Sequence, residues 1–85
     1  MKYELRIRPA ARRALEALPR QALSRVDGKI LALAGEPRPH GCGKLAGSAD
    51  RYRIRVGEWR VVYAIDDPAG VVSVLAVGHR REVYR

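Results

Sequence analysis

The fold is decided by the stretch Arg51-Tyr52-Arg53-Ile54-Arg55-Val56-Gly57-Glu58-Trp59-Arg60-Val61-Val62-Tyr63-Ala64-Ile65. Its residues alternate on both sides of Gly57-Glu58, a dipeptide with glycine at the first central position of a two-residue hairpin turn. Two antiparallel strands, 51–56 and 59–65, are therefore predicted, with Arg55 directly opposite Arg60. One face of this hairpin carries Tyr52, Ile54, Val56, Trp59, Val61 and Tyr63, and the other carries Arg51, Arg53, Arg55 and Arg60.

The segments around this hairpin predict the rest of the fold. A turn at 66–70 leads into an apolar, β-branched strand at 71–77, and residues 2–8 alternate as a half-buried strand. Pro9 is suited to a helix start, and apolar stripes at helical spacing predict two helices, the second running from about Arg20 to Ala34. Residues 35–50 are rich in Gly and Pro and predict a loop. We expect one α+β domain over residues 1–85: a strand, a helical hairpin, then a three-strand antiparallel meander, in two layers.

The composition excludes several classes of protein. The chain has 85 residues, of which 47% are hydrophobic and 31% charged, so we expect a single soluble domain. No apolar run approaches the roughly 20 residues of a membrane helix, and the alternating N-terminus does not resemble a signal peptide. Cys42 is the single cysteine, which excludes an internal disulfide and a cysteine-based zinc site. We expect a cytoplasmic protein with no membrane association, no cofactor and no metal.

The net charge is the most informative part of the composition. Seventeen basic residues against nine acidic ones give a net charge of +8 and a pI near 10.6. Such an excess favours a polyanionic partner: nucleic acid, a ribosome or a strongly acidic protein. Fourteen of the seventeen are Arg, whose planar guanidinium matches phosphate bidentately. The codon preference of a GC-rich genome would produce the same excess of arginine. The positions of the arginines are therefore needed to distinguish a functional excess from a codon effect.

The arginines of the hairpin are the strongest indication of a functional site. Directly opposed like charges destabilise a sheet, and no acidic residue is interleaved among Arg51, Arg53, Arg55 and Arg60 on this face. Locally unfavourable arrangements such as this one occur most often at functional sites. A bound phosphate backbone would relieve the repulsion between the arginines. The alternative is a solvated face whose long side chains splay apart.

The C-terminus supplies further groups suited to RNA chemistry. Gly78-His79-Arg80-Arg81-Glu82-Val83-Tyr84-Arg85 places Arg, His and Tyr together, which can clamp a phosphate, transfer a proton and stack on a base. With an ordinary pKa of about 6.5, His79 is the residue expected near the cluster that suits a general acid or base. Glu58 and Glu82 each lie beside Arg and are expected to be ion-pair partners.

The sequence also resembles a known family. The run from Lys44-Leu45-Ala46-Gly47 through Tyr52-Arg53-Ile54-Arg55-Val56-Gly57-Glu58-Trp59-Arg60-Val61-Val62-Tyr63-Ala64-Ile65-Asp66-Asp67 is similar to the core signature of the RelE/ParE toxin superfamily. The ending Val77-Gly78-His79-Arg80-Arg81-Glu82-Val83-Tyr84 resembles the RelE branch. The resemblance covers essentially the whole chain and agrees with the predicted fold.

The resemblance implies the toxin of a type II toxin–antitoxin system, a metal-independent endoribonuclease that cleaves mRNA in the ribosomal A site. Its implied partners are a cognate antitoxin, the ribosome and mRNA, with a toxin–antitoxin hetero-oligomer as the inactive form. Expected catalytic residues are Arg53, Arg55, Arg60, His79, Arg80 and Tyr84, of which all but His79 follow from motif positions. Expected RNA-binding residues are Lys44, Arg51, Arg81 and Arg85.

One departure from the family pattern bears on the chemistry. Positions 53 and 55 are often Lys in the family and are Arg here. Arginine stays protonated, so phosphate binding carries over to these positions whereas general-base catalysis does not. Two other functions stay open: a ParE-like toxin that inhibits DNA gyrase by binding, and a non-catalytic RNA- or ribosome-binding domain.

Overall fold

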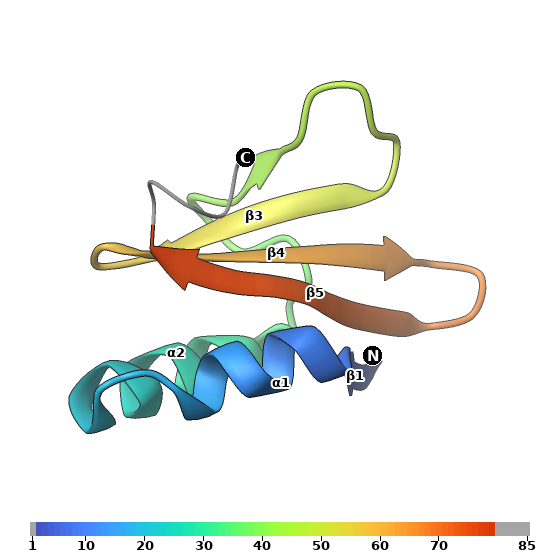
Figure 1. The fold of residues 1–85 in the computed structure, drawn as a ribbon. Helices are drawn as coiled ribbons and strands as arrows, with labels where there is room; N and C mark the ends of the chain where they lie inside the picture. Colours follow the sequence, from blue (N-terminus) through green and yellow to red (C-terminus); the bar gives the residue numbers. More distant parts are fainter. Residues whose placement is uncertain (1, 80–85) are drawn as a thin grey trace.

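The chain forms a helical layer beneath one face of a twisted sheet (Figure 1). The computed structural model describes residues 2–79. Its elements, in chain order, are β1 (Glu4–Ile7), α1 (Pro9–Glu16), α2 (Arg20–Ala32), β2 (Gly43–Lys44), β3 (Arg51–Val56), β4 (Trp59–Asp66) and β5 (Val71–His79). The α+β class and the two-layer arrangement predicted from the sequence are confirmed.

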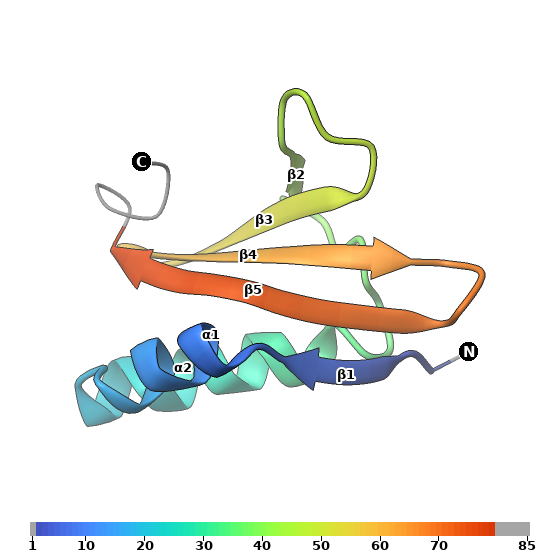
Figure 2. The same ribbon diagram turned by 45° about the vertical axis from the view of Figure 1, so that its right-hand side comes forward.

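Within the described residues the sheet has five strands in the order β1-β5-β4-β3-β2. The meander β3-β4-β5 is antiparallel, as predicted, whereas β1 pairs in parallel with β5. The last strand therefore lies between the first strand and the meander. Figure 2 shows β1 beside β5 at one edge of the sheet and β2 beside β3 at the other.

The prediction of an uninterrupted loop over 35–50 is wrong at two residues. Gly43 and Lys44 form β2, paired with Arg53 and Tyr52. So short a strand has no local pattern; it forms because β3 offers an open edge. Other boundaries move by one or two residues: α2 ends at Ala32 rather than Ala34, and β5 continues beyond residue 77 to His79.

The hairpin between β3 and β4 has the predicted turn and register. Gly57 adopts φ +63, a left-handed conformation that glycine adopts without steric cost, and Val56 pairs with Trp59. Arg55 consequently lies opposite Arg60, as the sequence predicts.

The core lies between the helices and one face of the sheet. Helix α1 begins with Pro9, whose missing N–H costs nothing in a first turn, and it buries Ala11 and Leu15. The core cluster comprises Ala11, Leu15, Val26, Ile30, Leu33, Ile54, Val56, Val61, Tyr63, Ile65, Val72, Val74 and Val77. The apolar face predicted for the hairpin is thus the buried one, and Tyr52 and Trp59 pack at its margin. No helix of the described part covers the other face of the sheet (Figure 2).

None of the helices within residues 2–79 is long and apolar enough to cross a membrane.

Candidate nucleic-acid interface

An arginine face occupies the side of the sheet that the helices leave uncovered, and it consists of Arg51, Arg53, Arg55 and Arg60. Because side chains alternate along a strand, the three arginines of β3 point away from the core to which Ile54 belongs. Arg60 joins them from β4, directly opposite Arg55. None of the four forms an ion pair with any residue in 2–79. No carboxylate of the described residues therefore neutralises their charge.

Arg60 is the most unusual residue of the arginine face. Its exposure is only 8%, whereas Arg55 is exposed. Its Nε is fully buried and has no hydrogen-bond partner in the described structure. Buried donors normally have partners, and an unpaired one costs about 1–3 kcal/mol. Arg60 is thus a cation held in place by packing, with an unused donor group.

Arg53 is positioned by the short edge strand. Its guanidinium lies so close to the backbone of Gly43 that a Cβ at that position would stand 2.7 Å from Arg53 Cζ. Any other residue at position 43 would push the guanidinium aside. The β2–β3 pairing therefore sets where one charge of the arginine face lies, a contribution that sequence reasoning missed.

His79 lies on the other side of the sheet. It pairs with Trp59, and directly opposed residues share a face, so His79 is on the helix side, whereas Arg60 pairs with Gly78 on the uncovered side. The imidazole meets the Trp59 indole edge-on, with ring centroids 5.7 Å apart. The structure does not bring His79 onto the arginine face, which weakens the geometric basis for its role in proton transfer.

Two further residues differ from the placement or the role that the sequence predicts for them. Lys44 is exposed and pairs with Tyr52, which places it on the helix side of the sheet. Glu58 makes no ion pair with residues 2–79, so its expected role as an ion-pair partner is wrong within that range. The remaining predictions, Arg80, Arg81, Glu82, Tyr84 and Arg85, lie outside the described residues.

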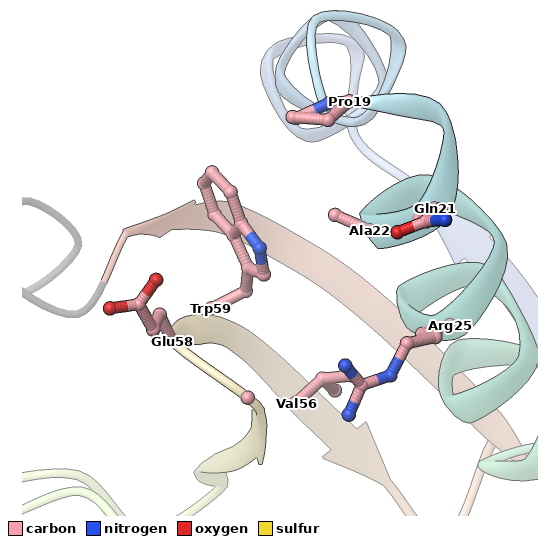
Figure 3. A pocket seen from close by; sticks show the side chains of 8 residues that line it. Pro19, Gln21, Ala22, Arg25, Val56, Glu58 and Trp59 are labelled. Atoms are coloured by element: carbon pink, nitrogen blue, oxygen red, sulfur yellow. The ribbon is translucent and has the colours of Figure 1, made fainter.

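A cavity of about 310 Å³ lies between the start of α2 and the β3–β4 turn. Figure 3 shows the Trp59 indole reaching from the sheet toward Ala22, with the Arg25 guanidinium near Val56. This cavity is on the helix side and is separate from the arginine face. The spacing of apolar residues in α2 does not predict this cavity, because from the sequence Arg25 is expected to be exposed to solvent.

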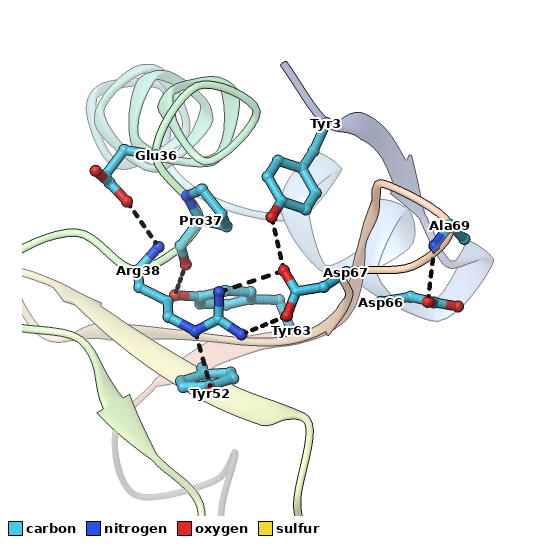
Figure 4. Close-up of polar contacts among 9 residues, drawn as sticks. All are labelled: Tyr3, Glu36, Pro37, Arg38, Tyr52, Tyr63, Asp66, Asp67 and Ala69. Carbon is cyan, nitrogen blue, oxygen red and sulfur yellow. Dashed lines mark hydrogen bonds and ion pairs between the residues drawn. The ribbon is translucent and has the colours of Figure 1, made fainter. Parts of the chain in front are cut away.

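A polar network at the opposite end of the sheet fixes the loop before β2 (Figure 4). Arg38 donates to the Asp67 carboxylate at 2.9 Å and to the Tyr52 hydroxyl at 3.2 Å, and its guanidinium lies over the Tyr52 ring. Tyr3 donates to Asp67 at 2.6 Å. The network joins the N-terminal strand, the loop, β3 and the β4–β5 turn.

The network also changes the protonation of its members. The Arg38 guanidinium, and then the Tyr3 hydroxyl, hold the pKa of the Asp67 carboxyl below its usual value. Behind it, burial raises the pKa of the Tyr63 hydroxyl, which donates to the Pro37 carbonyl at 2.7 Å. These groups are engaged with one another, so we assign the network to structure. Sequence reasoning missed it because its members are distant in the chain.

No group of three His, Cys, Asp or Glu side chains within residues 2–79 is arranged to hold a metal ion.

Comparison with known proteins identifies the family of this chain. The family described as "ParE toxin of type II toxin-antitoxin system, parDE" matches residues 5–84. Toxin RelG of Mycobacterium tuberculosis is 35% identical over 86 residues, covering 100% of this chain and 99% of that protein.

Solved structures show the same fold. The crystal structure of the toxin–antitoxin complex RelBE2 from Mycobacterium tuberculosis matches with a TM-score of 0.82 at 33% identity, covering 94% of this chain and 100% of the matched one. The archaeal RelE–RelB complex from Pyrococcus horikoshii matches with a TM-score of 0.84 at 30% identity, covering 98% and 100%. Since the family model, the sequence match and the fold agree, the chain belongs to the RelE/ParE superfamily, the toxins of type II toxin–antitoxin systems.

Proposed function

We propose that this chain is a RelE-type toxin that enters the ribosomal A site and cleaves the mRNA there. The observation that carries the proposal is Arg60: a buried cation next to the β3–β4 turn, opposed by Arg55, on a face whose arginines form no ion pair within residues 2–79. A phosphate bound beside Arg60 and Arg55 would offset the repulsion between the two arginines. Inhibition by protein–protein contact alone gives no reason for such an arrangement.

The reaction proposed needs no metal. The 2′-hydroxyl of the substrate loses its proton to a base, and its oxygen forms a bond to the adjacent phosphorus. The bond from phosphorus to the 5′-oxygen then breaks, and an acid protonates the departing oxygen. The products are a 2′,3′-cyclic phosphate and a 5′-hydroxyl. Arg53, Arg55 and Arg60 stabilise the negative charge that builds on the phosphoryl oxygens.

The acid and the base are assigned outside the arginine face. Arginine holds its proton at all working pH values, and His79 packs with Trp59 on the helix side. Tyr84, implied by the family resemblance, and groups of the ribosome are the remaining sources of the acid and the base. We assign phosphate contact to Arg80 and base stacking to Tyr84, with Arg81 and Arg85 adding charge for RNA binding.

We propose a cognate antitoxin as the regulatory partner, in a hetero-oligomer in the cytoplasm. Two of the matched structures are toxin–antitoxin complexes, and each contains a chain of this fold. An antitoxin segment with carboxylates would neutralise the arginine face, since the chain carries +8 overall. A stable complex that leaves all four arginines uncovered would instead indicate that the antitoxin acts by steric exclusion from the ribosome.

The decisive experiment incubates the purified chain with ribosomes programmed with a defined mRNA and maps new 5′ ends. We expect cuts within the A-site codon, 5′-hydroxyl ends, and activity that persists in EDTA with polyamine-stabilised ribosomes. An Arg60→Gln variant should bind ribosomes but not cleave. Intact mRNA, with wild-type protein bound to the ribosome, would indicate the non-catalytic RNA- or ribosome-binding function.

A second candidate function is considered because the description of the matching family names the ParE toxin. A ParE-like toxin would inhibit DNA gyrase by binding and would not cleave RNA. A gyrase supercoiling assay run beside the ribosome assay separates the two. Loss of supercoiling, unaffected by Arg60→Gln and without mRNA cleavage, would replace the nuclease proposal.

A further inference from the structure

A hollow of about 500 Å³ lies on the uncovered face of the sheet, at the end away from the β3–β4 turn. The strand registers show how it forms. Arg6 of β1 pairs with Ser73 of β5, Ser73 with Ala64 of β4, and Ala64 with Arg51 of β3. One row across four strands therefore has an arginine at each end and two small residues between them.

The two small residues keep the hollow open. Strands lie about 4.8 Å apart, so the backbones of Arg6 and Arg51 are roughly 14 Å apart across three strand spacings. Ala64 and Ser73 fill little of this span, and each arginine side chain is long enough to lean over it. Arg8, which directly follows β1, adds a third guanidinium to the lining, and the Ser73 hydroxyl adds a neutral donor.

The charges in and around the hollow are mixed but favour an anion. Arg8 and Arg51 make no ion pair with residues 2–79, whereas Arg6 is paired with Glu4. Asp50 also contributes to the lining and accepts a hydrogen bond from the Ser48 hydroxyl at 3.1 Å. The hollow is therefore less positive than the centre of the arginine face, which fits a secondary contact rather than a catalytic one.

We propose that this hollow is a second phosphate-binding site, which holds the RNA strand a few nucleotides away from the scissile phosphate. The inference rests on the proposed function, because the same strand would occupy the arginine face. Arg51 lies at the edge of the hollow and four residues from Arg55, roughly 13 Å along β3. Among residues 2–79 the lining contains no aromatic residue on which a base could stack, so the site contacts the RNA backbone and is indifferent to sequence.

The test measures binding of RNA that cannot be cleaved. Fluorescent 2′-O-methyl oligonucleotides of three and of nine nucleotides are titrated with the full chain, and anisotropy is recorded over a range of salt concentrations. The trinucleotide is short enough to occupy the arginine face alone, and the nonamer reaches the hollow as well. We expect Arg8→Gln to weaken nonamer binding about 3–10-fold and to leave trinucleotide binding within twofold. Arg51→Gln removes a charge that the arginine face and the hollow share, so it should weaken binding of both oligonucleotides.

The salt dependence and two further variants sharpen the result. Each lost phosphate contact should reduce the slope of log K against log salt by about 0.7 for a single strand. Asp50→Asn, which removes a carboxylate from the lining, should tighten nonamer binding. Arg13→Gln is the matched control, because it removes the same charge from an exposed position of α1 in the helical layer.

The proposal is overturned if Arg8→Gln weakens nonamer binding no more than Arg13→Gln does, whatever the effect of Arg51→Gln. It is also overturned if Arg8→Gln and Arg51→Gln lose binding of a poly-glutamate peptide while RNA binding is retained, which would make the hollow a contact for an acidic protein. Failure of the proposed nuclease function is seen separately, as intact mRNA on programmed ribosomes, and it leaves the nonamer result unaffected.

Discussion

Replacing Arg60 by methionine is expected to stabilise the protein while abolishing its activity. The Arg60 side chain is 8% exposed, so methionine, which is flexible and replaces arginine as far as Nε, keeps the packing of the apolar part of the side chain. The substitution removes a buried, unpaired Nε donor, which relieves about 1–3 kcal/mol. It also removes the like-charge opposition to Arg55, a few tenths of a kcal/mol because Arg55 is exposed.

Together these two effects should raise the free energy of unfolding by about 2 kcal/mol. The substitution gives up only the charged group itself. For a domain of this size each kcal/mol raises Tm by roughly 4–8 °C, so a rise of roughly 8–16 °C is expected. The matched control is Arg55→Met, which removes only the repulsion and should raise Tm by a few degrees at most. Thermal unfolding by circular dichroism at low phosphate measures both.

A second measurement connects stability to binding. Inorganic phosphate should raise the Tm of the wild type, because a ligand that binds only the folded state stabilises it, and it should leave Arg60→Met unchanged. A Tm of Arg60→Met several degrees below that of the wild type would refute the reasoning. Arg60 would then be a structural residue rather than a cation held for a ligand.

Three further outcomes are expected. Gly43→Ala should displace the Arg53 guanidinium and lower single-turnover mRNA cleavage about tenfold, with Tm within a few degrees because the guanidinium is flexible; unchanged cleavage would show that Arg53 needs no such placement. His79→Ala should lower Tm and leave single-turnover cleavage nearly unchanged, whereas a loss on the order of 10²-fold at constant Tm would restore the general acid–base role. Asp67→Asn should be less stable than the wild type at neutral pH and should respond less to acid. The folded-state pKa of Asp67 is lowered, chiefly by Arg38, so its contribution is present above about pH 4 and is lost as pH falls through that lowered value; parallel acid-unfolding curves would contradict this.

The sequence predicts the structure correctly where local periodicity and a single turn determine it. The alternation around Gly57 predicts two strands, their register and the opposition of Arg55 and Arg60, because a two-residue loop permits only one pairing. The face to which the helices pack follows from the same alternation.

The features that the sequence did not reveal depend on contacts between distant segments. The parallel pairing of β1 with β5 and the two-residue strand β2 are set by open sheet edges, which no local pattern encodes. His79 was expected near the arginines because it is close to Arg80 in sequence. The register places it beside Trp59 instead, since neighbours along a strand point to opposite faces.

The position of β5 has a consequence for the order in which the protein forms. This strand is the last to be synthesised among the described elements, yet it lies between β1 and β4. A nascent chain can make the local β3–β4 hairpin early, but the row from Arg6 to Arg51 and the neighbour of Arg60 at Gly78 require β5. The arginine face and the hollow beside it are therefore complete only after β5 has been synthesised and has paired. Non-local pairing of this kind also folds slowly, which delays their completion further.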